Sequence, residues 1–203
     1  MIFIKTAKTL KEYKDFVNFP FSLYKGSKYW VPPISNEELN TMDKSKNPVF
    51  KNAEAEYFLA YKDNKIVGRI AAIVNWVEVK EQNKNKVRFG WYDVIDDIEV
   101  SRKLIQAVIN FGKKRELSFI EGPVGFSNMD KAGLLTHGYD ELNTMITWYH
   151  NPYQKEHLKQ LPQPFPIDPK KTSSDQKVQK TLRQFGANAK SFCIWEVAQP
   201  HRY

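Results

Sequence analysis

The chain contains a single cysteine, Cys193, so no disulfide can form within it and a cysteine-based metal site is excluded. No stretch approaches the roughly 18 to 20 consecutive apolar residues that a bilayer-spanning helix needs. The first residues also lack an apolar segment long enough for a secretory signal. We therefore expect a cytoplasmic chain that makes no membrane contact.

Familiar catalytic signatures are missing as well. The four histidines show no metal-ligand spacing such as His-Glu-x-x-His, so we expect no metal site. No Walker, dinucleotide-binding or Gly-x-Ser-x-Gly pattern occurs. Any activity must therefore be sought in the order of the structural elements and in less regular groups of polar residues.

The composition is that of a folded chain with a basic surface. Of 203 residues, 41% are hydrophobic and 14% aromatic, which predicts a packed core and, at this length, one domain over residues 1–203. The net charge of +8 favours an anionic partner, but the lysines are scattered and no recognition-helix or stacking motif accompanies them. We expect no nucleic-acid partner, and nothing in the sequence predicts an oligomeric state.

Hydrophobic periodicity in the first half predicts a strand at residues 1–7 and a helix that opens at Thr9 and is interrupted by Pro20. Residues 27–55 read as mostly irregular, with a helix near 36–42. Strands are predicted at 56–61 and 65–77, and Asp63-Asn64 between them indicates a hairpin. Gly68 within the second strand indicates a bulge or a close backbone approach.

The second half contains the best-defined helix, which begins near Glu99 and repeats apolar residues at Val100, Leu104, Val108 and Phe111. With strands at 87–94 and 118–124 it forms a strand–helix–strand unit, so those strands should be parallel. A loop at 125–143, a strand at 144–150 and a helix from Asn151 to about 161 follow. A Pro-rich excursion is predicted at about 160–174, then a helix at 175–185 and a strand at 189–197.

This order resembles the GNAT (N-acetyltransferase-like) acyltransferase superfamily, and several phrases are similar to those of an uncharacterised bacterial branch of it. These phrases are Leu23-Tyr24-Lys25-Gly26, Tyr29-Trp30-Val31-Pro32-Pro33, the run from Ala53 to Tyr61, the run from Gly68 to Ile73, Gly133-Leu134-Leu135 and Asn151-Pro152-Tyr153. The resemblance covers roughly residues 1–158. It implies an α/β (α+β) fold with a mixed central sheet flanked by helices.

In that superfamily acyl-coenzyme A lies in the gap between two diverging central strands, and a glycine-rich helix start binds its pyrophosphate. The resemblance therefore implies acetyl-CoA or another acyl-CoA as co-substrate, with candidate contacts at Val94, Ile95, Lys103 and Asn151. However, the corresponding turn carries carboxylates, including Asp96 and Asp97, and no glycine. Such acids are expected to cap the helix themselves and to repel a diphosphate.

Two residues are candidates for catalysis. Glu56 lies in a strand that would face the acceptor, so it could serve as a base; strand alternation places Glu54 on the same side. Tyr153 begins a helix near the place where the superfamily has a thiolate-protonating tyrosine. The alternatives are that Glu56 is a solvated strand residue and that Tyr153 is a packing residue with a satisfied hydroxyl.

The loop after the 118–124 strand offers candidate acceptor contacts, because ligands usually bind beyond the carboxyl ends of the strands in open α/β sheets. Asn128 and Asp130 could orient an amine, and His137 or Asp140 could act as a base. The alternative is that these residues only form turns. Two functions therefore stay open: acyl transfer to a small-molecule or peptide amine, or a non-catalytic binding module of the same fold.

Overall fold

The computed structural model describes residues 1–127, 129–144, 147–161, 192–194 and 196–198, the last two segments by their backbone only. The predicted excursion at 160–174 beyond residue 161 and the predicted helix at 175–185 lie outside the described residues. The prediction of one domain over residues 1–203 stays a prediction.

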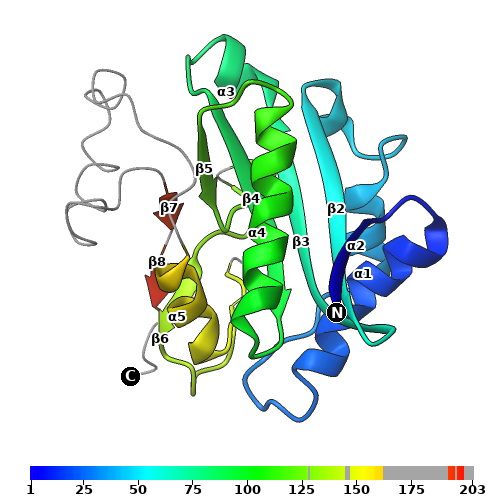
Figure 1. The fold of residues 1–203 in the computed structure, drawn as a ribbon, viewed down its shortest axis with the longest axis vertical. Helices are drawn as coiled ribbons and strands as arrows, with labels where there is room; N and C mark the ends of the chain where they lie inside the picture. The colour runs from blue at the N-terminus through cyan, green and yellow to red at the C-terminus, as the bar shows by residue number, and fades with distance from the viewer. Residues whose placement is uncertain (128, 145–146, 162–191, 195, 199–203) are drawn as a thin grey trace.

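A mixed sheet forms the centre of the molecule (Figure 1). Its six strands, in spatial order, are β1 (Ile2–Thr6), β2 (Ala53–Lys62), β3 (Lys65–Asn75), β4 (Lys86–Val94), β5 (Phe119–Gly122) and β7 (Phe192–Ile194). The pairs β1–β2, β2–β3 and β3–β4 are antiparallel. The pairs β4–β5 and β5–β7 are parallel. Two further strands, β6 (Leu134–His137) and β8 (Glu196–Ala198), pair separately.

Helices cover both faces of this sheet. The elements are α1 (Leu10–Leu23), α2 (Ser35–Met42), the 3₁₀ turn η1 (Pro48–Lys51), α3 (Trp76–Lys80), α4 (Ile98–Lys113) and α5 (Pro152–Gln160). One hydrophobic cluster joins the sheet to α4 and α5, and a second joins the opposite face to α1 and α2. In Figure 1, α4 crosses in front of the sheet. The expected mixed α/β fold with flanking helices is confirmed.

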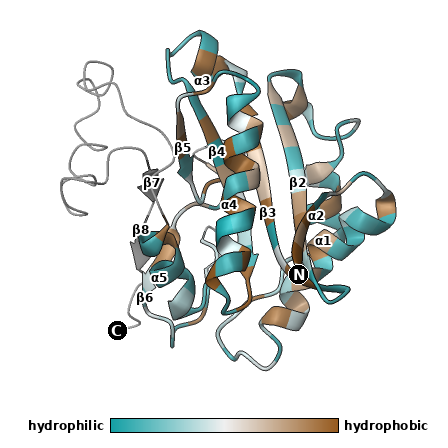
Figure 2. Ribbon diagram, viewed as in Figure 1, coloured by the Kyte–Doolittle hydropathy of each residue, from teal (hydrophilic) through white to brown (hydrophobic). Residues whose placement is uncertain are grey.

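The central helix α4 follows the expected apolar repeat. Val100, Leu104 and Val108 are fully buried against the sheet, and hydrophilic residues lie along the side that faces the viewer in Figure 2. Gly68 of β3 permits this packing, because a Cβ there would stand 2.9 Å from side-chain carbons of both Leu104 and Val100. The expectation of a close backbone approach at Gly68 is confirmed.

The hairpin between β2 and β3 forms as predicted. Asp63 and Asn64 both have positive φ, at 51° and 62°, the combination that a two-residue hairpin turn of the I′ type requires. Asn and Asp tolerate this region better than other residues with a side chain. β2 is longer than the predicted strand at both ends, whereas β3 begins at Lys65 as predicted and ends two residues early, because residues 76–80 form α3.

Three sequence-based expectations were wrong. Pro20 does not interrupt the first helix, which continues through it to Leu23. Residues 144 and 147–150, the described part of the predicted strand 144–150, form no strand, and the strand of this region is β6 instead. The predicted strand at 189–197 corresponds in its described residues to two short strands, β7 and β8.

Four charged side chains are buried together between α3, β4 and β5. Arg88 donates to Glu78 at 2.7 Å, and Lys86 is paired with Glu78 at 3.3 Å and with Glu121. Each of the four side chains is less than one tenth exposed. Two positive and two negative charges therefore balance locally, as buried charges must.

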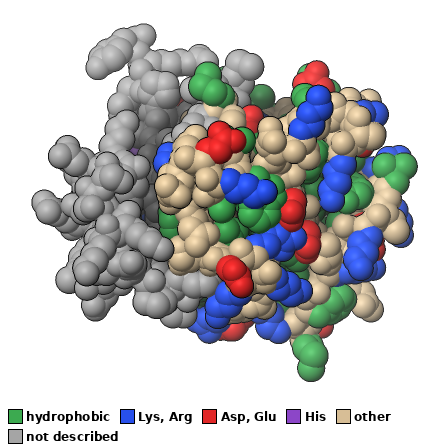
Figure 3. Space-filling view, turned by 90° about the horizontal axis from the view of Figure 1, so that it is seen from above, with side chains coloured by type: hydrophobic (Ala, Val, Ile, Leu, Met, Phe, Trp, Pro, Cys, Tyr) green, Lys and Arg blue, Asp and Glu red, His purple; other side chains and the backbone are tan. Residues whose placement is uncertain are grey.

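The outer surface mixes charges of both signs. Viewed from the end where α3 lies, Lys and Arg side chains stand among Asp, Glu and hydrophobic side chains (Figure 3). The positive charge is thus distributed on this face rather than gathered in one block. Separately, no helix within the described ranges is long and apolar enough to cross a membrane.

Candidate functional site

The strand β4 is longer than its parallel partner β5, and the Val124 amide just beyond β5 still donates to the Phe89 carbonyl of β4 at 2.8 Å. Lys86–Arg88 face Phe119–Glu121, and the rest of β4 runs on to Val94 without a β5 partner among the described residues. On its other side, β4 contains a bulge. Arg69 of β3 pairs with Asp93 and Ala71 pairs with Gly90, so two residues of β4 lie opposite the single residue Ile70. Trp91 lies in this bulge with a φ of 49°.

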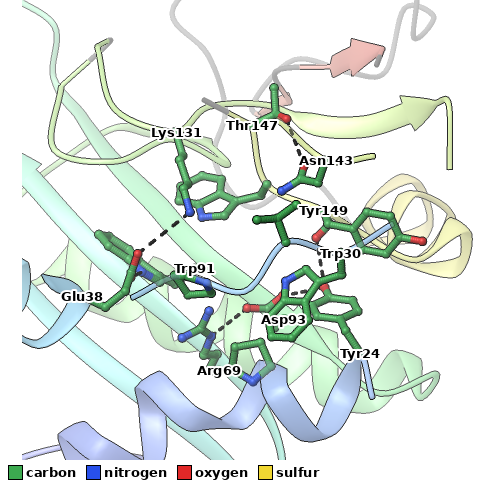
Figure 4. A pocket seen from close by; sticks show the side chains of 14 residues that line it. Tyr24, Trp30, Glu38, Arg69, Trp91, Asp93, Lys131, Asn143, Thr147 and Tyr149 are labelled. Carbon is green, nitrogen blue, oxygen red and sulfur yellow. Dashed lines mark hydrogen bonds and ion pairs between the residues drawn. The ribbon is translucent and has the colours of Figure 1, made fainter. Parts of the chain in front are cut away.

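A small cavity adjoins the bulge on the face of the sheet that α1 and α2 cover (Figure 4). Its free volume is about 20 Å³. We call it the Glu38 cavity. Its walls come from α1, α2, β3, β4, the segment 30–33, Lys131, and residues 143 and 147–149. The lining residues are Pro20, Tyr24, Trp30, Val31, Pro33, Glu38, Arg69, Trp91, Asp93, Lys131, Asn143, Thr147, Trp148 and Tyr149.

Asp93 forms the charged floor of the cavity. Its two carboxylate oxygens accept hydrogen bonds from the Tyr24 hydroxyl at 2.6 Å and from Arg69 Nε at 2.7 Å (Figure 4). All three residues are about 95% buried or more. Burial, reinforced by the Asp93 charge, raises the pKa of Tyr24, so its hydroxyl stays protonated and donates.

Pro20 explains how Arg69 is held. A proline in a helix cannot donate to the carbonyl four residues earlier, which leaves the Phe16 carbonyl of α1 without its helical partner. Arg69 Nη1 donates to that carbonyl at 2.8 Å, and its guanidinium lies 5.0 Å from the centre of the Phe16 ring. The proline that was expected to end the helix instead supplies an acceptor for the arginine beneath the cavity.

Glu38 is the more accessible carboxylate of the cavity. It projects from α2, accepts a hydrogen bond from Trp91 Nε1 at 2.6 Å, and has its other oxygen 4.0 Å from Lys131 Nζ. The Glu38 side chain is 17% exposed and that of Lys131 is 29% exposed. A carboxylate thus stands directly at the bulge, among the aromatic rings of Trp91, Trp30 and Trp148.

The start of α4 does not fit a pyrophosphate. Asp97 caps the helix by accepting from the Glu99 amide at 3.0 Å, and its second oxygen pairs with Lys62 at 2.9 Å. Through the Lys62 hydrogen bond, the pKa of Asp97 is lowered, so the carboxylate is charged near neutral pH. The helix N-terminus is therefore already occupied by an anion, as its acidic sequence predicted.

Side chains of α5 occupy the free stretch of β4. Gln154 Nε2 donates to the Tyr92 carbonyl at 3.0 Å, and the Tyr153 hydroxyl donates to the Val94 carbonyl at 2.8 Å. Asn151 contacts the same hydroxyl at 3.1 Å. Because these are backbone groups that a neighbouring strand would otherwise use, α5 takes the place of a strand along the end of β4, beyond the residues that pair with β5.

A chain of side chains ties α5 to α4 beside this place. His157 Nε2 lies 3.1 Å from Asp96, its Nδ1 lies 2.9 Å from Ser101 Oγ, and Tyr92 donates to that serine at 2.8 Å. The order Asp–His–Ser is that of a nucleophilic triad. Ser101 is fully buried, however, so no substrate reaches its oxygen, and we assign these contacts to packing of the helices.

The candidate cofactor and catalytic residues divide into two groups. Val94, Ile95, Asn151 and Tyr153 meet at the end of β4, where Ile95 donates to the Val67 carbonyl. Lys103 lies elsewhere: its ammonium donates to the Ile2 carbonyl of β1.

Glu56 lies on the α4 face of the sheet, opposite the Glu38 cavity. Its nearest charged partner is Arg115, at 3.8 Å, and Glu54 pairs with the same guanidinium at 2.7 Å. The expectation that both glutamates share one side of the strand is confirmed. Their contacts are those of a partly exposed ion pair.

The candidate acceptor contacts do not converge. Asp130 is exposed and accepts from the Ser127 amide at 2.8 Å, a turn-forming contact. His137 is exposed at the end of β6, with Thr136 Oγ1 at 3.2 Å, and Asp140 is exposed in the following turn. Asn128 lies outside the described residues. None of the described three lines the cavity, whereas Lys131 from the same loop does.

The sequence interpretation did not select the residues that form the cavity, namely Tyr24, Glu38, Arg69 and Asp93. A usable signal was present for two of them, because Arg69 and Asp93 are charged residues flanked by apolar residues inside predicted strands. Buried charges of this kind need a partner, and each proves to be the partner of the other. Within the described residues, no group of three or more metal-ligating side chains occurs.

Comparison with known proteins gives two curated bacterial relatives by sequence. Protein YghO of Escherichia coli is 30% identical over 161 residues, covering 78% of this chain and 40% of that protein. A bacterial ceramide synthase of Caulobacter vibrioides is 29% identical over 146 residues, covering 71% of this chain and 38% of that protein. The chain thus spans about two fifths of the length of these relatives. No family model matches the chain.

Solved structures with a similar arrangement are acetyltransferases of low sequence identity. A GNAT-family acetyltransferase from Staphylococcus aureus has a TM-score of 0.43 and 18% identity, over 59% of this chain and 71% of its own. A tandem GNAT protein of the clavulanic acid pathway has a TM-score of 0.46 and 9% identity, over 59% of this chain and 35% of its own. The antiparallel β1–β4 meander, the central helix α4 and the parallel pair β4–β5 match the arrangement expected of a GNAT-like fold.

Proposed function

We propose that this chain takes part in acyl transfer from an acyl-CoA to a primary amine, and that the amine binds in the Glu38 cavity. The observation that carries the proposal is the pair of carboxylates, Glu38 and Asp93, which line the cavity at the bulge of β4 together with Tyr and Trp rings and with their partners Lys131 and Arg69. Carboxylates and aromatic faces both attract an ammonium group.

The relative from Caulobacter supports an amine as acceptor. It is named a ceramide synthase, and ceramide is an amide of a long-chain amino alcohol. In the proposed reaction the neutral amine attacks the thioester carbonyl, a C–N bond forms and the C–S bond breaks. Glu38 first takes one proton from the bound ammonium, which leaves the neutral amine; after attack a second proton passes from the nitrogen to the departing thiolate, so the products are an amide and free CoA, and Glu38 returns its proton to water.

Glu38 and Asp93 have different roles in this proposal. Asp93 has both oxygens engaged by Tyr24 and Arg69, so it provides a fixed negative charge. Glu38 is partly exposed and its Oε1 has only a 4.0 Å contact with Lys131, so it is the group that can accept a proton.

The test is release of free thiol from acetyl-CoA and from long-chain acyl-CoA in the presence of short and long primary amines. Glu38→Gln should lower kcat by about a hundredfold or more, the usual contribution of a general base. Glu37→Gln, an exposed neighbour on the same helix, is the matched control and should retain full activity. Equal rates for Glu38→Gln and the wild type would reject the assignment of Glu38.

A second function, a non-catalytic binding module, is favoured by one specific observation. The α4 N-terminus is closed by Asp97, and the free edge of β4 is closed by Gln154 and Tyr153. An acyl-CoA would have to bind with its phosphates elsewhere or displace these contacts.

Thermal melting with acyl-CoA separates the two functions. A ligand present at a hundred times its Kd should stabilise the fold by about 2.7 kcal/mol. For a chain of this size, that amounts to a rise in Tm of several degrees. No rise with acetyl-CoA, long-chain acyl-CoA or free CoA would reject acyl transfer and favour the binding module.

A further inference from the structure

Exposed hydrophobic side chains directly precede or follow residues that line the Glu38 cavity, and one of them lines it. They come from the end of α1, the segment 29–34 and the segment that contains residue 142, and we call them the apolar rim: Phe21 (38% exposed), Tyr29 (37%), Val31 (42%), Ile34 (64%) and Leu142 (47%). Val31 lines the cavity itself, as do Trp30 and Pro33 between the rim residues. The segment 29–34 therefore has one side toward the cavity and one toward solvent.

The rim is held in this outward position by specific contacts. Gly26 turns the chain with a φ of 86°, and Ser27 Oγ accepts from the amides of Tyr29 and Trp30 at 3.3 and 3.2 Å. The Tyr29 carbonyl accepts from the Asn143 amide at 2.8 Å, which ties the two halves of the rim together. These hydrogen bonds hold the segment so that its apolar side chains stay exposed. Exposed apolar side chains that lie together are typical of an interaction surface.

Trp30 completes this support from below. Its ring packs edge-on against Phe21 at 5.2 Å and lies 5.4 Å from Tyr24, the residue that donates to Asp93. The rim therefore rests on the same residues that form the charged floor of the cavity. A molecule bound at the rim would be in reach of that floor.

The size of the cavity limits what can enter it. A volume of about 20 Å³ has room for a water or an amine end, but not for a whole acceptor molecule. The remainder of an acceptor that reaches Glu38 would lie outside, against the apolar rim. That geometry suits an acceptor with a polar amine at one end and an apolar chain behind it.

We infer that the apolar rim is a docking surface for a lipid bilayer, from which a long-chain amine enters the Glu38 cavity with its amine first. Tyr and Trp side chains beside lysines are typical of segments that lie at a membrane interface, and Lys25 and Lys28 are exposed on this segment. Such contact requires no membrane-spanning helix. The expectation of no membrane contact rested on the lack of such a helix.

Charge plays the smaller part in this docking. Glu37 and Asp140 are exposed on elements that flank the rim and would oppose an anionic surface, offsetting Lys25 and Lys28. Apolar contact should therefore dominate, so binding should depend only weakly on salt. This distinguishes the rim from a purely electrostatic membrane site.

The test is co-sedimentation of the purified chain with vesicles of phosphatidylethanolamine and phosphatidylglycerol, without acyl-CoA. The triple variant Tyr29→Ser, Ile34→Ser and Leu142→Ser changes rim residues that do not line the cavity. It should bind vesicles about tenfold more weakly or worse, since it removes three exposed apolar side chains. The matched control, Phe3→Ser with Leu10→Ser, changes exposed apolar residues away from the cavity and should bind like the wild type.

Three results would overturn the docking surface. The wild type staying in the supernatant would do so, and so would equal binding by the rim and control variants. A change of oligomeric state in the rim variant, with no vesicle binding by the wild type, would show that a second copy covers the rim. Circular dichroism melts of both variants check that they fold.

The identity of the acceptor rests on the proposed function, but the docking does not. Vesicle binding that is lost in the rim variant, together with no thiol release, would support the surface and reject acyl transfer. Acylation of a short amine without vesicle binding would support acyl transfer and reject the docking surface. If both hold, the rim variant should keep its rate with a short soluble amine and lose rate with a long-chain amine presented in vesicles.

Discussion

At the scale of single residues, Arg69 links β3 to both β4 and α1 beneath the cavity. It pairs with Asp93 and donates to the Phe16 carbonyl that Pro20 leaves free. Arg69→Met should destabilise the fold by about 3–5 kcal/mol, because it leaves a buried carboxylate without its cation. Urea unfolding monitored by circular dichroism measures this loss.

The control for Arg69 is an arginine in an exposed pair. Arg102 contacts Glu99 at 2.6 Å with both side chains about half exposed. Arg102→Met should change stability by no more than about 0.5 kcal/mol. Similar losses for the two variants would show that the Asp93 charge is satisfied without Arg69.

His150 should make stability depend on pH. It is 1% exposed and its Nδ1 accepts from the Leu135 amide at 3.3 Å; burial lowers its pKa to about 4. The unfolded histidine binds a proton below about 6.5, whereas the folded one does so only below about 4. Between these values the unfolded state binds more protons, so stability falls as pH falls.

The variant His150→Asn isolates this contribution, since asparagine offers an acceptor but does not titrate. Between pH 7 and pH 4 the wild type should lose about 3 kcal/mol more than the variant. Denaturant titrations at several pH values give this difference. If the free energy of unfolding changed with pH by the same amount in the wild type and the variant, His150 would be solvated or would have a partner for its proton.

At the scale of elements, the start of α4 should depend on its cap. Asp97→Ala removes both the hydrogen bond to the Glu99 amide and the pair with Lys62, and should cost about 1–2 kcal/mol. Lys62→Met removes only the pair and should cost about 0.5 kcal/mol. Thermal melts compare the two variants; equal losses would show that the ion pair, and not the cap, stabilises this turn.

The elements also show how far sequence reasoning reached. Local signals were sufficient for α4, with its apolar repeat and acidic cap, and for the Asp63-Asn64 hairpin. Pro20 was misjudged because the Phe16 carbonyl that it frees is satisfied by Arg69, 53 positions further along the chain than Phe16. The predicted strand at 144–150 failed because a β-rich composition does not reveal whether a neighbouring strand is available to pair.

The cavity was harder to predict than the elements around it. Glu38 reads as an ordinary solvated helix residue, and its contact with Trp91 is set by how α2 lies against β4. Tyr24 belongs to a phrase that carried the family resemblance but no assigned role. The four residues come from α1, α2, β3 and β4, so no spacing along the chain indicates that they meet.

At the scale of the whole molecule, protection from hydrogen exchange should be uneven. The residues of β3 from Ile70 to Val74 are fully buried between two hydrophobic clusters, so their amides should exchange only through global unfolding. Amides of α2 should exchange through local opening, because that helix has no side-chain cap and buries only Met42. Mass spectrometry of peptic fragments tests this order, which equal protection of α2 and β3 would contradict.

The contacts of Gln154 and Tyr153 with β4 have a consequence for solubility. The carbonyls of Tyr92 and Val94 would be unpaired on a strand without these side chains, and an open strand edge is a template on which another chain can add itself. By occupying this edge, α5 protects the chain from self-association. Loss of the helix should therefore favour aggregation through strand addition even under conditions in which the rest of the sheet stays folded.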